Sequence, residues 1–339
     1  HVIEDEGRKV KLPIAMASMN KIKSGEDIKN WARLKDIPLS TLVVLTPKFD
    51  GLSLCVDEIS KEATTRGNGT VGQNSNKHYE LISNKLKSNN DSFQYTYGEV
   101  MISKKTFLDK YSSDFANPRN LVAGLLNSKT PSESLKDCKY IKYGIEKELR
   151  PTFQSKKQIL DFLNKNQEIN VNYKICRISE LTEELLIDLF SEWSKDFEID
   201  GIIIEVNDLN YQKVLGRETS SNNPVFARAF KHSSFEQTAT SRVLGITWNV
   251  SKGGLVKPII NITPVQLDGV TVSNITGNNA RFIKEMGIGE GALITVKRSG
   301  MVIPLVVDVL ERVDFEMPVI EGTELEWNEA GIELITTTE

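Results

Sequence analysis

The stretch Thr46-Pro47-Lys48-Phe49-Asp50-Gly51 lies between two apolar runs, Leu42 to Leu45 and Leu52 to Val56. An apolar run, a polar bend with glycine and a second apolar run predict two strands joined by a turn. Lys48 would then emerge where a strand ends. A lysine in such a place can act as a nucleophile when cations or burial lower the pKa of its amine from about 10.4. Taken alone, Lys-x-Asp-Gly favours a plainer interpretation, a surface lysine beside a turn.

Length and composition indicate a globular protein. Of 339 residues, 39% are hydrophobic and 26% are charged, and this length predicts two domains. No apolar run approaches the roughly 18 residues of a membrane-spanning helix, and we expect no signal peptide. The cysteines Cys55, Cys138 and Cys176 are far apart, so the sequence indicates neither a zinc site nor a disulfide framework. We therefore expect a cytoplasmic protein without a membrane partner.

The net charge of −4 is unevenly distributed along the chain. Residues 313–339 carry eight acidic side chains and no lysine or arginine, so residues 1–312 carry +4. An acidic total therefore does not exclude a nucleic-acid partner for the main body of the protein. A charge of +4 over 312 residues is also ordinary for a globular protein.

The first part of the chain contains a helix signal and a glycine-rich loop. Ser24 precedes two acidic residues and an apolar pattern that predicts a short helix to Leu34. Three glycines between Gly67 and Gly72 predict a loop whose backbone can approach a ligand closely. Arg66 at its mouth could contact a phosphate, or it is a solvated arginine beside a hairpin turn.

Several charged residues stand at the ends of predicted strands or in loops. Glu99 occupies an apolar setting between Tyr95 and Met101, where a carboxylate must face a partner or a site. Asp200 heads the run to Ile204, and Lys231 ends the alternating segment that starts at Phe226. We hypothesise that Lys48, Arg66, Glu99, Asp200 and Lys231 converge into a polyanion pocket.

The pattern of predicted elements changes after about residue 234. Short predicted strands separated by glycines run from Val243 to Leu310, and one helix over about 278–286 interrupts them. Five strands with a late helix predict a small OB-type barrel, a fold that often binds nucleic acid.

Seven stretches taken in order carry a family resemblance: Lys48-Phe49-Asp50-Gly51; Thr65-Arg66-Gly67-Asn68-Gly69-Thr70; Gly98-Glu99-Val100; Phe115-Ala116-Asn117-Pro118-Arg119-Asn120; Ile199-Asp200-Gly201-Ile202-Ile203-Ile204; Ala229-Phe230-Lys231; and Lys297-Arg298-Ser299-Gly300 with Val302-Ile303-Pro304. In this order and spacing they resemble the NAD-dependent DNA ligases of bacteria and some viruses. The resemblance implies an α+β fold, in which a nucleotidyltransferase domain of the ATP-grasp-like ligase type, with antiparallel sheets and helices, precedes a small OB-fold β-barrel. The expected domains are 1–233, 234–312 and an acidic tail, 313–339.

The resemblance also implies the reaction. Lys48 would attack the α-phosphate of NAD and hold AMP, the AMP would move to the 5′-phosphate of a DNA nick, and the 3′-hydroxyl would displace it. Magnesium would assist, nicked duplex DNA would be the partner, and DNA repair and replication would be the processes served. Each step is phosphoryl transfer, in which the protein mainly aligns groups and neutralises charge.

The family pattern assigns a role to each matching residue. Catalysis is expected from Lys48, Asp50, Asp200 and Lys231; nucleotide binding from Ser18, Met19, Lys48, Arg66, Glu99, Tyr143 and Lys231; metal binding from Glu99 and Asp200; and DNA contacts from Arg119 and Arg298. Tyr143 would stack on the adenine, and Glu99 would bind the ribose hydroxyls.

Departures from the family pattern bear on the choice of cofactor. The residues Thr46, Glu205, Asn127 and Met301 replace a glutamate, a lysine, an arginine and an acidic residue. Glu205 reverses a charge near the adenine. An ATP-using or RNA-sealing relative, and a non-catalytic nucleic-acid-binding subunit of a split ligase, therefore remain alternatives.

The two ends of the chain depart as well. The small domain that grips the nicotinamide half has no counterpart, and it is either cut off upstream of His1 or absent. The tail resembles a zinc finger in which Pro318, Glu321 and Thr336 stand near the expected thiolates, so no zinc is expected. We expect a reduced ligase of a bacterial or virus-infected cell, or a fragment that a separate subunit completes.

Overall fold

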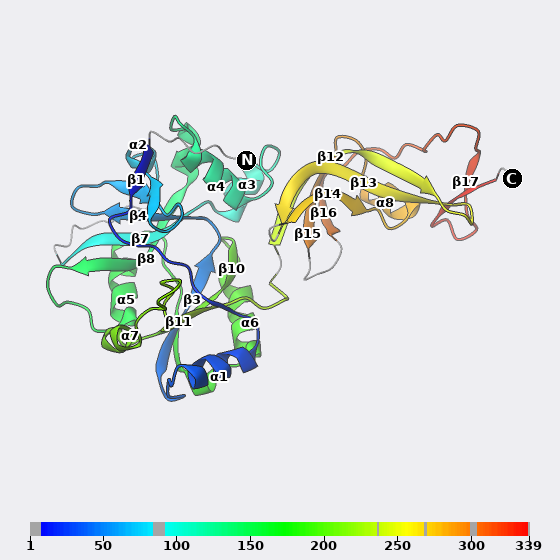
Figure 1. The fold of residues 1–339 in the computed structure, drawn as a ribbon. Helices are drawn as coiled ribbons and strands as arrows, with labels where there is room; N and C mark the ends of the chain where they lie inside the picture. Colours follow the sequence, from blue (N-terminus) through cyan, green and yellow to red (C-terminus); the bar gives the residue numbers. More distant parts are fainter. Residues whose placement is uncertain (1–7, 84–91, 236, 268–269, 299–303, 338–339) are drawn as a thin grey trace. The chain divides into compact units, whose positions relative to one another are not determined.

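The computed structural model describes residues 8–83, 92–235, 237–267, 270–298 and 304–337 (Figure 1). The chain forms two compact units, of which the first contains residues 1–109 and 118–235 and the second contains residues 110–117 and 236–339. The first unit therefore includes residues 234–235, and the second includes residues 110–117 and the acidic tail 313–339.

A five-stranded sheet forms the centre of the first unit, in the order β2-β11-β10-β3-β9. Its neighbours are antiparallel except for β11 and β2, which are parallel. The strands are β2 (Lys21–Ile22), β3 (Leu42–Phe49), β9 (Lys174–Arg177), β10 (Ile199–Val206) and β11 (Ala227–Phe230). The register pairs Lys48 with Gly201, so the end of β3 lies beside the start of β10.

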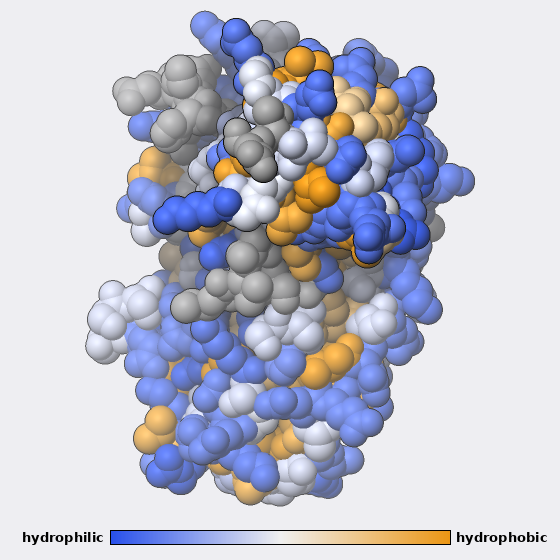
Figure 2. All heavy atoms as spheres, turned by 90° about the vertical axis from the view of Figure 1, so that its right-hand side faces the viewer, coloured by the Kyte–Doolittle hydropathy of each residue, from blue (hydrophilic) through white to orange (hydrophobic). Residues whose placement is uncertain are grey.

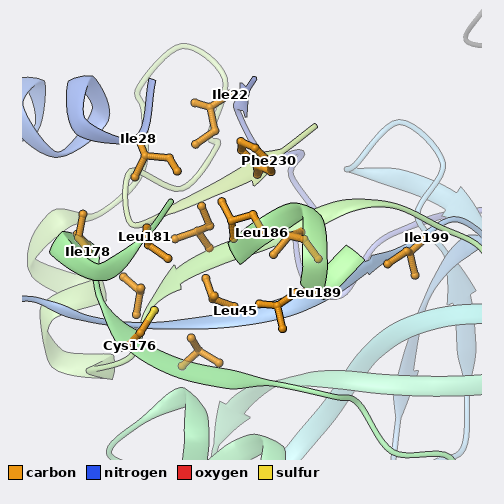
Figure 3. Packing of buried hydrophobic residues seen from close by; sticks show 14 of the residues in the cluster. Ile22, Ile28, Leu45, Cys176, Ile178, Leu181, Leu186, Leu189, Ile199 and Phe230 are labelled. Atoms are coloured by element: carbon orange, nitrogen blue, oxygen red, sulfur yellow. The ribbon is translucent and has the colours of Figure 1, made fainter. Parts of the chain in front are cut away.

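The main hydrophobic core packs against this sheet, and Figure 3 shows part of it. Leu45 of β3 and Ile202 and Ile204 of β10 are fully buried in it. Burying each such side chain contributes roughly 1.5–3 kcal/mol. This packing fixes the strands, and it therefore fixes where the polar side chains at their ends emerge.

Helices complete the first unit, and their sequence signals are visible in the structure. Helix α1 (Gly25–Leu34) begins at Ser24, whose hydroxyl accepts a hydrogen bond from the Asp27 amide at 3.2 Å, and it buries Ile28 and Trp31. The helix predicted from Ser24 to Leu34 is thus confirmed. The other helices are α2 (Asn76–Tyr79), α3 (Lys104–Lys110), α4 (Pro118–Asn127), α5 (Lys156–Asn166), α6 (Glu183–Trp193) and α7 (Leu209–Leu215), with the 3₁₀ helices η2 (Glu133–Asp137) and η3 (Ile178–Glu180).

A four-stranded antiparallel sheet, in the order β5-β4-β7-β8, carries the other polar residues of interest. Its strands are β4 (Leu52–Asp57), β5 (Ala63–Thr65), β7 (Phe93–Met101) and β8 (Lys139–Glu148). The strand β1 (Lys9–Lys11) pairs separately with β6 (Val71–Gln73). Helices combined with these antiparallel sheets confirm the α+β class.

The second unit consists mainly of paired β-strands, and its described residues include the helix α8. Its sheet runs β16-β15-β12-β13-β18-β17, and β14 pairs with β13. The strands are β12 (Gln237–Val250), β13 (Leu255–Leu267), β14 (Val270–Thr276), β15 (Leu293–Arg298), β16 (Leu305–Glu311), β17 (Leu325–Trp327) and β18 (Leu334–Thr336), and the helix is α8 (Ala280–Met286). The five strands and the late helix predicted after residue 234 are all present among the described residues.

The C-terminal hairpin β17–β18 joins this sheet through β13. Leu334 pairs with Val256, and both are fully buried beside Ala280, with Trp248 and Trp327 packed against them. Lys257 of β13 also forms an ion pair with Glu333. Apolar packing therefore attaches the hairpin, and all three cysteines of the chain lie in the first unit.

Charged and polar residues predominate on the face seen in Figure 2, where apolar side chains appear in small separate groups. Among the described residues, no helix combines the length and apolar character needed to cross a membrane.

Gly98 tests how tightly β7 and β8 are paired. A Cβ at this position would lie 2.0 Å from the carbonyl oxygen of Ile141, so Gly98→Ala must push the two strands apart. We expect a loss of about 2 kcal/mol of unfolding free energy in urea titrations. Gly245→Ala in β12 is the control, because its added Cβ meets no atom within 4 Å. Equal stability of both variants would contradict this account.

Candidate functional site

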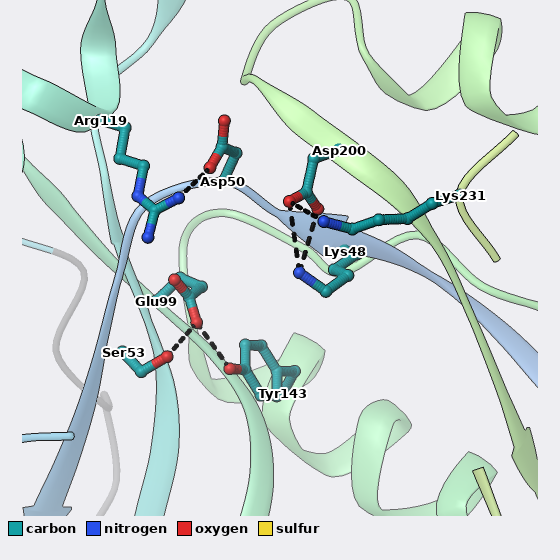
Figure 4. Close-up of polar contacts among 8 residues, drawn as sticks. All are labelled: Lys48, Asp50, Ser53, Glu99, Arg119, Tyr143, Asp200 and Lys231. Carbon is teal, nitrogen blue, oxygen red and sulfur yellow. Dashed lines mark hydrogen bonds and ion pairs between the residues drawn. The ribbon is translucent and has the colours of Figure 1, made fainter. Parts of the chain in front are cut away.

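Two lysines share the carboxylate of Asp200 at one end of the central sheet (Figure 4). The Nζ of Lys48 lies 3.2 Å and 3.3 Å from the two oxygens of Asp200, and the Nζ of Lys231 lies 3.0 Å from Oδ2. All three side chains keep some solvent contact, with 29%, 27% and 10% exposed for Lys48, Lys231 and Asp200. We call these residues the Asp200 cluster.

Neighbouring strands bring the Asp200 cluster together. Lys48 is the next-to-last residue of β3, Asp200 is the second residue of β10, and Lys231 directly follows β11. Gly201 leaves space for the side chain of Lys231. A Cβ at position 201 would lie 2.5 Å from the Phe230 carbonyl oxygen and 3.2 Å from Cγ of Lys231. A side chain at position 201 would therefore displace Lys231.

Glu99 occupies a second, drier part of the same region. Its Oε1 accepts hydrogen bonds from the hydroxyl groups of Ser53 at 2.7 Å and Tyr143 at 2.8 Å. Burial raises the pKa of Glu99 from 4.5 to about 7, although these two hydrogen bonds and the charge of Lys48 lower it. Glu99 thus changes its protonation state near neutral pH.

The ring of Tyr143 lies among aromatic neighbours. It stacks on Phe49 with ring centres 6.4 Å apart and meets Tyr97 edge-on at 5.6 Å. Burial and the nearby Glu99 carboxylate raise the pKa of Tyr143, so its hydroxyl stays a hydrogen-bond donor. A flat apolar surface therefore lies next to a carboxylate, an arrangement that suits a nucleoside.

Asp50 contacts Arg119 instead of the Asp200 cluster. Nη1 of Arg119, which is 54% exposed on α4, lies 3.4 Å from Oδ1 of Asp50. Burial and the charge of Asp200 raise the pKa of Asp50 to about 6, whereas Arg119 and Lys48 lower it. A phosphate that binds Arg119 would compete with this weak pair.

Arg66 is anchored to the N-terminal segment. Its Nε donates to the Met16 carbonyl at 2.8 Å, and its Nη2 donates to the Ser18 hydroxyl at 2.6 Å. Met19 follows in the same segment and is partly buried. The structure thus brings Arg66 and Ser18 together, although no described contact joins them to the Asp200 cluster.

Arg298 belongs to the second unit, where it ends β15 opposite Gln237. Ser299, Gly300, Val302 and Ile303 of the last motif, and the departure at Met301, lie outside the described residues.

The buried carboxylate of Glu205 is paired with a residue that the sequence did not point to. The Nζ of Lys156, at the start of α5, lies 3.8 Å from Oε1 of Glu205 and donates to the Tyr143 carbonyl. Gln212 donates to the other oxygen at 2.9 Å. Lys156 and Glu205 are only 5% and 9% exposed, so each needs the other. Thr46 is likewise buried, opposite Ile203.

Sequence reasoning also missed Ser53 and Phe49. Ser53 faces Glu99 because the two residues are partners in the β4–β7 register. Apart from its place in the first motif, nothing in the sequence marks Phe49 as a site residue. Its ring contacts Tyr143, which lies on a strand of the other sheet. Strand pairing reveals the first contact, and only the packing of the two sheets reveals the second.

The described residues contain no group of three or more His, Cys, Asp or Glu side chains placed to hold a metal ion. Asp200 already holds two ammonium groups, and Glu99 accepts two hydrogen bonds. Magnesium usually binds one or two carboxylates together with phosphates and waters. The two carboxylates therefore fit a magnesium ion only if phosphate oxygens complete its coordination.

Comparison with known proteins places these features in a family context. Residues 5–235 match the NAD-dependent DNA ligase adenylation domain, and residues 240–316 match the NAD-dependent DNA ligase OB-fold domain.

Similar proteins carry names that agree with these domain matches. A DNA ligase of Acanthamoeba polyphaga mimivirus is 33% identical over 341 residues, which cover 97% of this chain and 50% of the relative. DNA ligases of Clostridium botulinum (strain Eklund 17B / Type B) and Persephonella marina are 29% and 30% identical over 320 and 334 residues, or 87% of this chain in each case, and 47% and 45% of the relatives. The chain thus spans about half the length of the curated relatives that it matches.

The raised pKa of Glu99 predicts a pH-dependent stability. The folded state holds the Glu99 proton up to about pH 7, whereas an unfolded glutamate loses it near pH 4.5, so this residue lowers the unfolding free energy as pH rises between these values. Glu99→Gln removes the effect. Between pH 5 and pH 8, we expect the variant to gain about 2 kcal/mol relative to the unsubstituted protein in urea titrations.

Glu192→Gln, at an exposed position of α6, is the control and should show no such pH-dependent gain. A stability difference between Glu99→Gln and the unsubstituted protein that is the same at both pH values would mean that Glu99 ionises normally.

Proposed function

Because the chain belongs to the NAD-dependent DNA ligase family, we propose that it seals nicks in duplex DNA through an adenylyl group carried on Lys48. The observation that supports this most directly is the Asp200 cluster, which presents two lysine amines and one carboxylate at the end of one sheet. Such a site suits phosphoryl transfer, where positioning and charge neutralisation supply most of the catalysis.

In the first proposed step, Nζ of Lys48 attacks the α-phosphorus of NAD. An N–P bond forms, and the P–O bond to nicotinamide mononucleotide breaks. Asp200 accepts a hydrogen bond from the attacking amine at 3.2 Å. Asp200 can take a proton from the Lys48 amine and pass it to solvent. Lys231, held by the same carboxylate, neutralises charge on the phosphate oxygens.

In the second step, an oxygen of the 5′-phosphate at a DNA nick attacks the phosphorus of the AMP on Lys48, so a P–O bond forms and the N–P bond breaks. In the third step, the 3′-hydroxyl oxygen attacks the phosphorus of the 5′-phosphate, its proton passes to solvent, and the P–O bond to AMP breaks. Arg119 is exposed and only weakly paired, which suits contact with the nick phosphate. Arg298 of the second unit is the further DNA contact that we propose. Contacts of this kind are made to the phosphate backbone of DNA. Binding should therefore depend on salt concentration and not on the DNA sequence.

The nucleoside half of the substrate is assigned to the Glu99 region. We assign Tyr143 to stacking on the adenine and Glu99 to the ribose hydroxyls, since its carboxylate already accepts two hydroxyl hydrogen bonds. The anchored pair of Arg66 and Ser18, with Met19 beside it, would bind the edge of the nucleotide. Asp50 would act on Lys48 through charge alone, because its described side-chain contact is with Arg119.

Magnesium is the proposed metal, and Glu99 and Asp200 are its proposed protein ligands. When bound, the ion supplies positive charge on the transferring phosphate. We propose no structural zinc, because Pro318, Glu321 and Thr336 stand near the positions where the resemblance implies thiolates, and because apolar packing attaches the hairpin β17–β18. Roles in DNA replication and repair, a cytoplasmic location and a separate completing subunit belong to the same proposal.

Labelling of the protein tests the first step. We expect adenylate-labelled NAD, with Mg²⁺, to leave label on the unsubstituted protein in a denaturing gel. Lys48→Ala should abolish the label, whereas Lys29→Ala on α1 should keep it. Label from ATP alone would favour an ATP-using relative, as the altered Thr46 and Glu205 allow. If the Lys48→Ala variant is still labelled, Lys48 is not the nucleophile.

A pre-adenylated nick tests the third step separately. Lys48→Ala should fail on an ordinary nick and still join a nick that already carries AMP, because that step needs no amine nucleophile. Lys231→Ala should join the pre-adenylated nick at least about a hundredfold more slowly, because the variant lacks a positive charge beside the reacting phosphate. Denaturing gels of labelled DNA give both rates. Failure of all variants and of the unsubstituted protein would favour the non-catalytic subunit.

A further inference from the structure

Strand β2, at the edge of the central sheet, carries a lysine to which no role has been assigned. Lys21 is opposite Ala229 in the parallel β2–β11 pair, and Ile22 is opposite Phe230. Both Ile22 and Phe230 are buried in the main core. Because side chains alternate along strands, Lys21 lies on the other face of the sheet.

That other face is the one that carries the Asp200 cluster. Lys231 follows Phe230, and its amide donates to the Ile22 carbonyl at 2.8 Å, so β2 continues beside β11 up to this point. The register places Lys21 opposite Ala229, Ala229 opposite Ile203, and Ile203 opposite Thr46. Lys48 follows Thr46 by two residues on the same strand and so shares its face. Lys21, Lys48 and Lys231 therefore project from the same face of three strands.

The three lysines have one carboxylate between them. Asp200 pairs with Lys48 and Lys231, whereas Lys21 is exposed and its ammonium has no ion-pair or hydrogen-bond partner in the part of the chain that the structure describes. The positive charge of Lys231, followed by burial and then by the charge of Lys48, lowers the pKa of Lys21. This repulsion would be relieved by an anion bound next to the Asp200 cluster.

We propose that Lys21 binds the second phosphate of a diphosphate-containing nucleotide, beside the first phosphate held by Lys48 and Lys231. The inference rests on the proposed function of the Asp200 cluster. Strands are spaced about 4.8 Å apart, and β2 lies beyond β11 on the side away from β3. A first phosphate between Lys48 and Lys231 lies over β10, and a second one towards the sheet edge comes within reach of Lys21.

This position gives Lys21 a role in the departure of the leaving group. NAD and ATP both carry a second phosphate joined to the α-phosphorus through a bridging oxygen, and AMP carries none. When the N–P bond to Lys48 forms, the bond from phosphorus to that oxygen breaks and the electron pair stays on the leaving phosphate. The ammonium of Lys21 neutralises the negative charge that develops on that phosphate.

Binding measurements with one-phosphate and multi-phosphate nucleotides test this proposal. Isothermal titration calorimetry in EDTA, which prevents magnesium-dependent turnover, would compare NAD, ATP and AMP as ligands of the full chain. We expect Lys21→Met to weaken NAD and ATP about tenfold and AMP less than about twofold. Lys21→Arg should keep the affinity for NAD. Lys23→Met, which removes the same charge two residues away, is the matched control and should change none of them.

The outcomes separate this proposal from the proposed function. If the unsubstituted protein is labelled by NAD but Lys21→Met weakens AMP as much as NAD, or weakens neither, the role of Lys21 is overturned and the ligase assignment stands. If no label forms but the NAD-specific loss is seen, the ligase assignment fails and the diphosphate site stands. If the unsubstituted protein binds none of the three nucleotides, both are overturned. Lys21→Gln gives a second neutral variant, and urea midpoints verify that each variant folds.

Discussion

The ion pairs of Asp200 are the interaction on which the site depends. Two ammonium groups at close range repel each other, and a single carboxylate between them offsets that repulsion. Asp200 can do this because the strands β3, β10 and β11 are neighbours in a sheet that is packed into the main core. The apolar residues of these strands therefore determine where the charged side chains at the strand ends are placed.

Asp200 and Glu99 differ in the way their surroundings treat a negative charge. Asp200 keeps some solvent contact and binds two cations, whereas Glu99 is buried and has only hydroxyl donors on its carboxylate among the described contacts. Burial without a paired cation raises the pKa of Glu99 to about 7. One carboxylate is thus suited to holding lysines, and the other to meeting neutral hydroxyl groups or a metal ion that arrives with a ligand.

Glu205 and the C-terminal hairpin both depend on residues that other elements of the chain supply. Glu205 brings a negative charge into a buried position, and Lys156 of α5 supplies the opposite charge at 3.8 Å. The C-terminal hairpin has no thiolates, and Val256, Ala280 and Leu334 form an apolar cluster that attaches it to the sheet. In both cases the compensating residues come from other elements, so a position-by-position comparison of motifs does not find them.

The sequence by itself determined the family, the α+β class and most of the elements, and the matches to the adenylation and OB-fold domains confirm that family. These features are local, since they depend on motif order, on alternation along strands and on the cap at Ser24. Only the tertiary structure decided which residues meet: that Asp200 holds both Lys48 and Lys231, that Asp50 pairs with Arg119, and that Lys21 stands next to the cluster. The reason is strand pairing, because register and sheet order join segments far apart in the chain, and no short stretch of sequence records that choice.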